Sequence, residues 1–406
     1  MNEQLIVKNF GPIKDATVDF KRVTVFIGPT GGGKSTLAKL AATVKQGKMV
    51  DFGTSDAEEL LSKYGISSYI IEKSSIIKWR LENELSFSID TTKDSSENPD
   101  LEIHQVLTED YENNYESYKS EMHAELEKYL SEPKGSVLPA SLVADIRSKM
   151  DSVIKNYIKE SMVSILFPLI PHYIPAERIL LASIGESWAG IIRDDIGLPK
   201  LLVEFANEFS NARKAIKNIK IPFFSAEYSY NEGQDFIKSA ENNKLFNLHE
   251  TASGIQSVTP LLVLLEHLSR NTEQAQSFII EEPELNLYPT AQQGLLNWLV
   301  EKCTQGENDL TITTHSPYIL SSCNLLLEAY KVAQLRPDLE EEIAAIVPKA
   351  CWLNPNEFAA YYVADGTVKP ITDERTHLIG GNELDAVSGD ISDSFRKLLR
   401  LKKQAV

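Results

Sequence analysis

"VFIGPTGGGKSTLAKL", residues 25–40, is the stretch that decides the fold. It joins an apolar run to a helix-type sequence through consecutive glycines, a lysine and two hydroxyl residues. Gly28–Thr36 satisfies the pattern GxxxxGK[ST] of a phosphate-binding loop. The glycines let backbone N–H groups turn inward around phosphates, and the start of the following helix adds the positive end of its dipole. The sequence therefore predicts a nucleotide site between a strand and a helix.

The loop also supplies specific side chains. The Lys34 ammonium is of the kind that reaches the β- and γ-phosphates, and a hydroxyl such as that of Ser35 binds Mg²⁺. The predicted nucleotide contacts are Gly28, Pro29, Thr30, Gly31, Gly32, Gly33, Lys34, Ser35 and Thr36. A glycine-rich turn without function is the alternative, and the expected strand before it and helix after it argue against that. The loop alone leaves kinase, GTPase, helicase and switch ATPase open.

The length, composition and net charge of the chain restrict the class of protein. The chain has 406 residues, 42% of them hydrophobic, which is ample for one large domain or two intertwined lobes. Its net charge of −17 argues against nucleic-acid binding through bulk charge, although a local basic groove stays open. Cys303, Cys323 and Cys351 form no CxxC pair and are expected to be reduced thiols. The first residues lack a long apolar signal segment, and residues 162–175 are too short to span a bilayer, so we expect a cytoplasmic protein without membrane contact.

The hydrophobic pattern indicates an α/β frame with a polar middle. Residues 4–28 contain about three runs of strand length, the last at Val23–Ile27, and a helix is expected from Ser35 to about Val44. Residues 82–134 are rich in Asp, Glu, Ser and Asn, which favours a solvated, mostly helical or irregular insertion. In the second half, helices and strands alternate, and this implies parallel strands covered by helices. The elements expected there are helix 254–270, strand 277–281, helix 290–303, strand 310–314, helix 317–328 and a strand pair within 361–371.

Two stretches have a basic helical pattern. Residues 204–220 have helical spacing, and residues 392–404 are typical of a basic amphipathic helix. The basic side chains of the first stretch, which are candidates for contact with an acidic trigger or DNA, are Arg213, Lys214, Lys217 and Lys220. The ordinary alternative is a solvated helix face.

"SFIIEEPELNLYP", residues 277–289, places two carboxylates at the end of an apolar run. We interpret Glu281 as a ligand of the metal and Glu282 as the general base that polarises the attacking water. Adjacent side chains on a regular strand point to opposite faces, so the chain must leave the strand here, in agreement with Pro283. A solvated acidic turn is the alternative.

"LTITTHSPYIL", residues 310–320, is another apolar run that ends in polar residues. His315 lies at the expected carboxyl end of this strand, where open α/β sheets bind ligands, and it can contact the γ-phosphate or the attacking water. The alternative is a surface histidine beside a helix that Ser316 caps.

"HETASGIQSVTPLLVLL", residues 249–265, begins an apolar helix with Ser253-Gly254. A serine hydroxyl and the exposed amides of a helix start form a second anion site. The alternative is that Ser253 is an ordinary helix cap.

The order of these four motifs resembles that of ABC-type ATPases of the SMC, RecF and OLD kind within the AAA family. "ASGIQS" resembles the signature motif that contacts the γ-phosphate of ATP bound to the opposite subunit. "IIEEPELNLYPTAQ" resembles the Walker B and D-loop segment, with Glu281 where many relatives carry Asp, and His315 matches the switch histidine. "YIPAERILLAS", residues 173–183, is similar to a segment common in this group, which implies that Arg178 approaches the nucleotide. Gln105 is available as the Q-loop glutamine, but its acidic surroundings do not support that assignment.

The resemblance covers residues 1–60 and 170–330. It implies an α/β fold: an ABC-type ATPase head with a P-loop parallel core sheet, an N-terminal antiparallel β subdomain and an inserted helical lobe. It also implies ATP and Mg²⁺ as cofactors, with Ser35 and Glu281 on the metal and Glu282 and His315 as catalytic residues. The expected division is 1–60 (head with the phosphate loop), 61–170 (inserted, mostly helical lobe), 171–330 (head with the signature, Walker B and switch His) and 331–406 (C-terminal α/β extension).

The chain departs from the family pattern in two ways. The middle part has no sustained heptads, in contrast to SMC-type proteins with long coiled coils. Residues 330–406 contain no DxD, in contrast to OLD and Gabija nucleases with a C-terminal Toprim domain. We therefore expect an ATPase without a nuclease site of its own.

The family's signature motif completes the ATP site of a second subunit, which implies an ATP-bridged homodimer or a higher ring. ATPases of this compact form resemble the ATPase subunits of the bacterial anti-phage systems PARIS, our first choice, and Septu. The resemblance implies a slow ATPase that acts as a sensor and scaffold. It would hold, release or activate a separate effector nuclease, with a phage protein or DNA as trigger.

Two other functions stay open. A RecF-like DNA-repair ATPase would bind duplex DNA directly through a basic groove, and the charge of −17 counts against it. A metabolic P-loop enzyme such as a kinase would make Ser253-Gly254 and His315 coincidences.

Overall fold

The structure is a computed structural model of the 406-residue chain. It describes residues 3–46, 60–70, 74–81, 84–90, most of 116–128 and of 143–154, 169–184, 197–270, 273–380 and residue 396. Gln105, the loop at 91–100 and nearly all of the basic helix expected at 392–404 lie outside the described residues.

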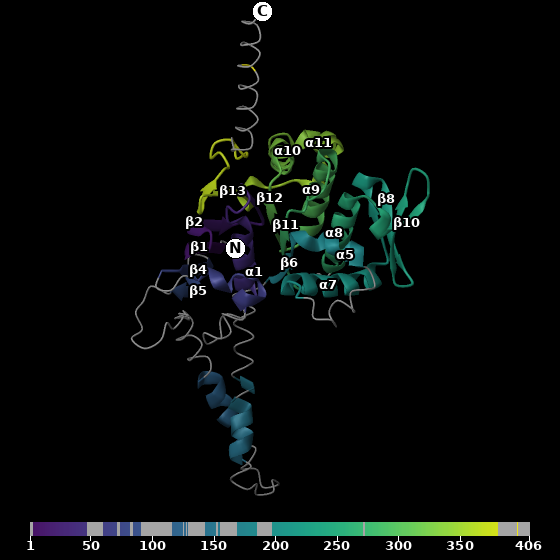
Figure 1. The fold of residues 1–406 in the computed structure, drawn as a ribbon. Helices are drawn as coiled ribbons and strands as arrows, with labels where there is room; N and C mark the ends of the chain where they lie inside the picture. Colours follow the sequence, from purple (N-terminus) through teal and green to yellow (C-terminus); the bar gives the residue numbers. More distant parts are fainter. Residues whose placement is uncertain are drawn as a thin grey trace, which may run out of the picture.

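A ten-stranded mixed sheet forms the body of the molecule (Figure 1). Its strand order is β5-β4-β1-β2-β14-β13-β3-β12-β11-β6. The bounds are β1 Glu3–Phe10, β2 Ile13–Phe20, β3 Val23–Ile27, β4 Ile76–Leu81, β5 Glu84–Asp90, β6 Ile170–Ile174, β11 Gln276–Glu281, β12 Asp309–Thr314, β13 Phe358–Ala364 and β14 Thr367–Pro370. The α/β class with a parallel core and an N-terminal antiparallel part is confirmed.

The parallel core consists of β6, β11, β12, β3 and β13. Every residue of β3, β11 and β12 is buried, as expected for strands covered on both faces. Because parallel strands end at the same edge, the phosphate loop after β3, the carboxylates after β11 and His315 after β12 share one edge of the sheet.

Helices cover both faces of this core. α1 (Lys34–Lys45) packs on one face. Further helices of the described chain are α5 Ile179–Ile184, α7 Lys200–Ile216, α8 Ser253–Leu268, α9 Pro289–Cys303, α10 Pro317–Leu335 and α11 Glu340–Ile346. Val25 of β3 packs in the hydrophobic core that contains α8, α9 and α10, whereas Phe26 packs in the core that contains α1. Alternation of side chains along a buried strand thus supplies both cores.

The C-terminal strands lie inside the sheet. β13 pairs in parallel with β3, and β14 returns antiparallel to β13 and contacts β2. The strand pair expected within 361–371 is confirmed. The C-terminal extension expected at 331–406 implies a part outside the head. In the structure, β13 instead lies within the main sheet, directly beside the strand that carries the phosphate loop.

A second, four-stranded antiparallel sheet follows α7, in the order β10-β9-β8-β7. Its strands are β7 Asn218–Ile221, β8 Ala226–Asn231, β9 Gln234–Ser239 and β10 Leu245–Asn247. The helix expected over 204–220 is wrong at its end: Lys217 has a φ of 49° and closes α7, and Lys220 lies on β7. Arg213 forms an ion pair of 2.8 Å with Asp235, so the four basic side chains do not form one free helix face.

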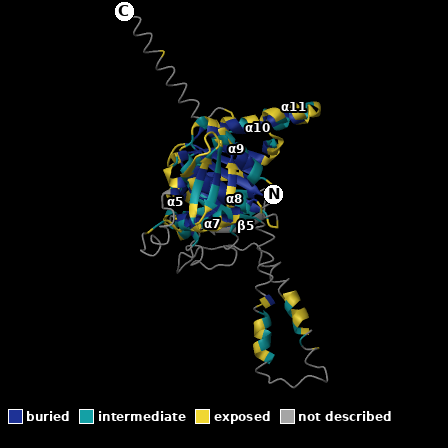
Figure 2. Cartoon of the chain, turned by 90° about the vertical axis from the view of Figure 1, so that its right-hand side faces the viewer, coloured by how far each residue is buried: buried dark blue, intermediate teal, exposed yellow. Residues whose placement is uncertain are grey.

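The region after α1 contains strands as well as helices. β4 and β5 extend the N-terminal antiparallel sheet through pairing of β4 with β1, a feature that the helical or irregular interpretation of 82–134 missed. Residues 116–124 and 143–151 are helical and lie away from the body (Figures 1 and 2). Their surfaces are mostly exposed or partly exposed, in agreement with an inserted helical lobe. The exact division into domains stays a prediction.

Two sequence expectations concern smaller features. Cys303, Cys323 and Cys351 are free and buried, and burial raises the pKa of the Cys323 thiol to about 12. In the parts of the chain that the structure describes, no helix is long and apolar enough to cross a membrane.

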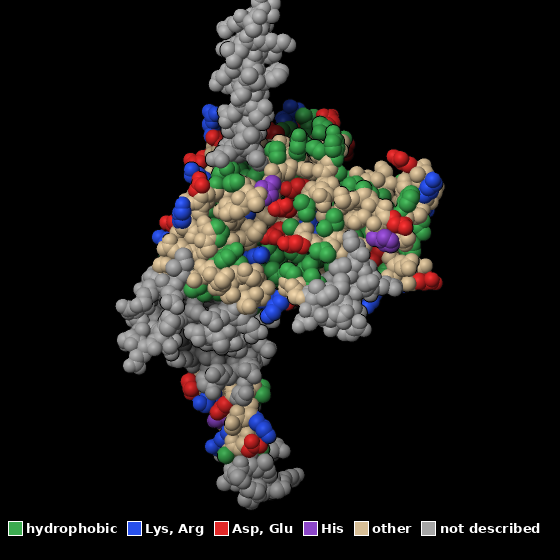
Figure 3. Space-filling model, in the orientation of Figure 1, with side chains coloured by type: hydrophobic (Ala, Val, Ile, Leu, Met, Phe, Trp, Pro, Cys, Tyr) green, Lys and Arg blue, Asp and Glu red, His purple; other side chains and the backbone are tan. Residues whose placement is uncertain are grey.

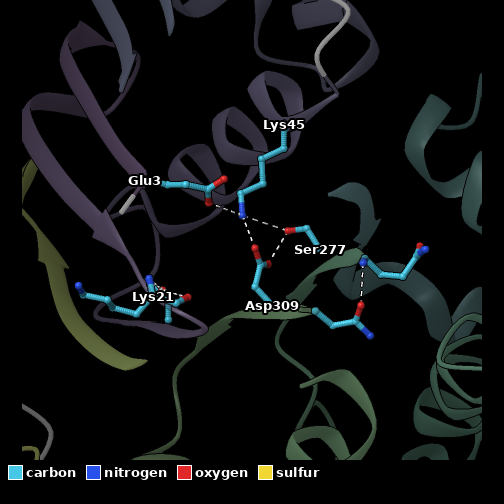
Figure 4. Close-up of polar contacts among 8 residues, drawn as sticks. Glu3, Lys21, Lys45, Ser277 and Asp309 are labelled. Carbon is cyan, nitrogen blue, oxygen red and sulfur yellow. Dashed lines mark hydrogen bonds and ion pairs between the residues drawn. The ribbon is translucent and has the colours of Figure 1, made fainter. Parts of the chain in front are cut away.

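A buried ion-pair cluster joins the far edge of the sheet to α1 (Figure 4). The Lys45 ammonium lies 2.7 Å from Glu3 and 2.5 Å from Asp309, and it donates to the Ser277 hydroxyl at 3.2 Å. Burial alone would lower the pKa of Lys45, but the Asp309 and Glu3 carboxylates outweigh it and raise the pKa above its usual value. The cluster thus connects the end of α1 to β1, β11 and β12.

Lys45→Ala is expected to destabilise the fold. It leaves Glu3 and Asp309 buried without a cation, which should lower the free energy of unfolding by about 3–5 kcal/mol. Lys349→Ala, which breaks the exposed pair with Glu340, is the control and should cost less than about 1 kcal/mol. Urea denaturation followed by circular dichroism measures both, and equal losses in the two variants would contradict the role of the cluster.

Candidate nucleotide-binding and hydrolysis site

The phosphate loop runs close to the backbone of β13. A Cβ built on Gly28 would lie 2.2 Å from the Val363 carbonyl oxygen, and one on Gly32 would lie 2.5 Å from the same oxygen. Gly28, Gly31 and Gly33 have φ angles of 149°, 78° and 109°, a region that side chains rarely adopt. The glycines are therefore required by backbone conformation and by the neighbouring strand.

The loop leads into an uncapped helix start. Gly33 is the N-cap of α1 and provides no side-chain hydrogen bond, so amides of the first turn stay available to an anion. Lys34 is buried, and its ammonium donates to the Gly28 carbonyl at 2.9 Å and the Pro29 carbonyl at 3.0 Å. Burial lowers the pKa of Lys34, against the opposing effect of Glu282 and Glu281. Ser35 is exposed at the same turn.

Glu281 is the last residue of β11 and is only 6% exposed. One of its carboxylate oxygens is buried without a hydrogen-bond partner, as is the neighbouring Tyr173 hydroxyl. Burial, followed by the charge of Glu281, raises the pKa of Tyr173 well above its usual value. A buried, unpartnered carboxylate oxygen fits a metal ion, so Glu281 and the Ser35 hydroxyl are suitable ligands for Mg²⁺.

Glu282 leaves the strand, as the sequence predicts for adjacent carboxylates. Its φ is 42°, uncommon for a residue with a side chain, and its amide donates to the Thr313 carbonyl at 2.9 Å. The Glu282 carboxylate lies 3.2 Å from Nε2 of His315. Burial and then Lys34 lower the pKa of His315, against the effect of Glu282. The structure thus brings together the loop lysine, the expected base and the expected switch histidine.

Glu284 is a site residue that the sequence interpretation missed. Its buried carboxylate accepts hydrogen bonds from the Thr314 hydroxyl and, at 3.1 Å, from the His315 amide. The sequence did contain a signal for Glu284, because it is the third carboxylate of the stretch EEPE, residues 281–284. Glu284 holds the end of β12. Ser316 caps α10 by accepting from the Tyr318 amide at 3.2 Å, so the cap that belonged to the alternative interpretation of this segment is present.

The Ser253-Gly254 turn is not an ordinary serine cap, and that alternative is wrong. Ala252 is the N-cap of α8 and supplies no side-chain bond, and Ser253 is the exposed first residue of the helix. A Cβ on Gly254 would lie 2.7 Å from the Asn286 carbonyl oxygen, so the turn packs against the segment that follows β11. In the described part of the chain, no hydrogen bond or ion pair joins Ser253 to the phosphate loop of the same subunit.

Arg178 lies behind the candidate site, against the backbone of Glu281 and Glu282, and its approach to the nucleotide stays a prediction. Its side chain is fully buried, and its guanidinium donates to backbone carbonyls of three different segments. On the face in Figure 3, acidic, basic and histidine side chains gather near the centre of the molecule, in the region of the parallel strand ends in Figure 1.

Comparison with known families identifies the class of protein. The family described as "AAA ATPase domain" matches residues 1–165 and 197–320, more than half of the chain. The chain belongs to this family, and it is an ATPase of the AAA type.

Solved structures of SMC head domains are similar in outline. The SMC head domain with an extended coiled coil bound to the C-terminal domain of ScpA, from Pyrococcus furiosus, is 10% identical. The match covers 96% of this chain and 98% of that chain, with a TM-score of 0.37. The SMC head domain from Thermotoga maritima is 11% identical over 92% of this chain and 100% of that chain, with a TM-score of 0.36. A search of curated proteins finds no match.

Gly32→Ala is expected to abolish nucleotide binding, because its new methyl group would meet the Val363 carbonyl and displace the loop. Gly197→Ala, at a position with open space around it, is the matched control and should bind as the unaltered chain does. Titration with a fluorescent ATP analogue measures both, and normal binding by Gly32→Ala would show that the loop does not hold the phosphates.

The rate of hydrolysis is expected to fall in acid. The pKa of His315 is lowered, so the imidazole is neutral at pH 7 and becomes charged only below its usual titration range. A charged imidazole would pair with the Glu282 carboxylate and withdraw it from the attacking water. kcat should therefore decline as the pH falls through this pKa, and the pH profile of His315→Gln should not show this decline. If kcat of the variant declines in acid as it does for the unaltered chain, the decline is caused by the titration of another group.

Proposed function

We propose that this protein is an ATP-driven switch that hydrolyses ATP between two copies of the chain. The observation that carries the proposal is the 3.2 Å contact of Glu282 with His315 at the edge that also holds Lys34. Lys34 would bind the phosphates together with the loop amides, and Glu281 and Ser35 would hold Mg²⁺. When bound, Mg²⁺ neutralises charge on the β- and γ-phosphates.

The residues around the phosphates have distinct parts in hydrolysis. The Glu282 carboxylate takes the proton of the attacking water as general base. Neutral His315 has a single N–H, and when Nε2 carries it this group donates to the Glu282 carboxylate and holds it in place. Glu284 fixes the His315 amide, so that the end of β12 stays in place.

The second copy supplies Ser253-Gly254. This turn has an exposed hydroxyl and uncapped amides, which suit an anion, but α8 and α1 pack in different hydrophobic cores on opposite faces of the sheet. A γ-phosphate held by the loop of one subunit and by this turn of its partner explains both features. ATP then stabilises the dimer and hydrolysis releases it.

We further propose that this switch is the sensor and scaffold of a bacterial anti-phage defence complex. The support is the resemblance of the motif order and compact form to the ATPase subunits of PARIS and Septu systems. The ATP-bound dimer would hold a separate effector nuclease until a phage protein or DNA changes its state. A RecF-like ATPase that binds duplex DNA is the alternative, and a DNA affinity that falls steeply with salt would favour it.

Glu282→Gln tests the shared site. The variant should bind ATP, hydrolyse it about 10²-fold more slowly or worse, and stay dimeric, because the base is lost and the phosphate contacts remain. Lys34→Ala should bind no ATP and should not dimerise. Light scattering with and without ATP measures the mass, and a Glu282→Gln variant that stays monomeric with ATP would overturn the shared site.

The defence role is tested in cells. The gene is expressed with its neighbouring reading frames, and phage plating is compared for the unaltered chain, Lys34→Ala and Glu282→Gln. Protection that both variants lose is the expected result, since the proposed sensor needs both ATP binding and release. Protection that persists in Lys34→Ala, or its absence in the unaltered chain, would exclude this role.

A further inference from the structure

Arg178 is the only fully buried arginine among the described residues, and it lies between two parts of the proposed ATP site. It ends the short 3-10 helix Ala176–Arg178, which follows β6. Within the described part of the chain, its four hydrogen bonds go to backbone carbonyl oxygens and none goes to a carboxylate.

The first part of the site is the end of β11. The Arg178 guanidinium donates to the Glu281 carbonyl at 2.7 Å and to the Glu282 carbonyl at 2.6 Å. Glu282 has the positive φ described above, and such a backbone is unfavourable unless the surroundings enforce it. These two bonds, with the amide bond to Thr313, hold Glu282 in that conformation.

The second part is the start of α8. Nε of Arg178 donates to the Ser257 carbonyl at 3.1 Å, one helical turn after Ser253. Pro260 lies inside α8 and has no N–H to donate to the carbonyl of Gln256, so this turn has one helical bond fewer. The Ser257 hydroxyl is also buried without a partner. The bond to the Ser257 carbonyl therefore attaches Arg178 to the helix directly after the Ser253-Gly254 turn, where α8 has lost one of its own bonds.

The fourth bond, from the guanidinium to the Pro175 carbonyl at 3.1 Å, fixes Arg178 to its own segment. The guanidinium is planar and its donors keep fixed directions, so a shift of one carbonyl changes the geometry at the others. Burial lowers the pKa of Arg178, the carboxylates of Glu284, Glu282 and Glu281 oppose this, and the resulting pKa of about 10 is still well above neutral pH.

We propose that Arg178 is a positioning residue that joins the start of α8, at the Ser257 carbonyl, to the Glu282 backbone. A phosphate seated on Ser253-Gly254 thereby moves the general base of the same subunit. This inference rests on the proposed shared ATP site. In the proposed dimer, Ser253 contacts the ATP that is bound to the loop of the partner, whereas Glu282 acts on the ATP that is bound to its own loop. Arg178 therefore couples the two ATP molecules.

The test compares Arg178→Lys with Arg213→Lys. A lysine keeps the charge but cannot reach three separate segments from one nitrogen. Arg178→Lys should bind a fluorescent ATP analogue as tightly as the unaltered chain and lower kcat about 10- to 100-fold, the usual cost of a small misplacement. Arg213→Lys changes a partly buried pair with Asp235 away from the site, and it should leave kcat unchanged.

A second readout follows the coupling itself. Amide hydrogen exchange should show that a non-hydrolysable ATP analogue protects residues 253–258 and 280–284 in the unaltered chain. In Arg178→Lys the protection of 280–284 should be lost while that of 253–258 remains. Joint protection in the variant, or a kcat within about twofold of the unaltered chain, would overturn the inference.

Other outcomes are also decisive. If Arg178→Lys and Arg178→Gln both fail to fold, Arg178 is a structural residue and the positioning role is wrong. If the unaltered chain does not hydrolyse ATP, or Lys34→Ala hydrolyses it equally well, the proposed function itself fails. The failure of the coupling and the failure of the ATP site are therefore distinguished by different samples.

Discussion

Parallel pairing of β3, β12 and β11 is the constraint on which the site depends. It places the ends of three strands, far apart in the sequence, at one edge of the sheet. The phosphate loop, Glu282 and His315 follow those ends directly, so their spacing is set by backbone hydrogen bonds rather than by flexible loops. The fully buried strands between two hydrophobic cores keep this arrangement rigid, and the Lys45 cluster closes the opposite edge.

The site combines strain with several fixed contacts. Glu282 has an unfavourable backbone angle, and bonds from Arg178 and to Thr313 hold it there. Glu284 fixes the neighbouring strand end through the His315 amide. The side chains that would touch phosphate, metal or water therefore sit on a backbone whose position other residues determine. This is the usual way in which a catalytic site keeps an uncommon conformation.

Much of the fold and of the site could be predicted from the sequence, because short sequence patterns determine those parts. The phosphate loop, the strands at 277–281 and 310–314 and the departure of Glu282 from the strand follow from apolar runs, glycines and adjacent carboxylates. Long-range pairing was not predictable in this way. Nothing in the sequence of β13 shows that it lies beside β3, and nothing near Arg178 shows that its partners are carbonyls from two other segments. The helix over 204–220 failed at its end because a left-handed residue at Lys217 leads directly into a strand.

The insertion of β13 beside β3 also affects how the protein forms during synthesis. The strand that carries the phosphate loop is made first, but its two neighbours in the sheet begin at Asp309 and Phe358. One edge of β3 lacks its partner until Asp309–Thr314 has been made, and the other lacks it until Phe358–Ala364 has been made; contacts of such sequence separation form slowly. A nascent or truncated chain should therefore have an incomplete phosphate loop. The ATPase would become competent only when nearly all of it has been translated.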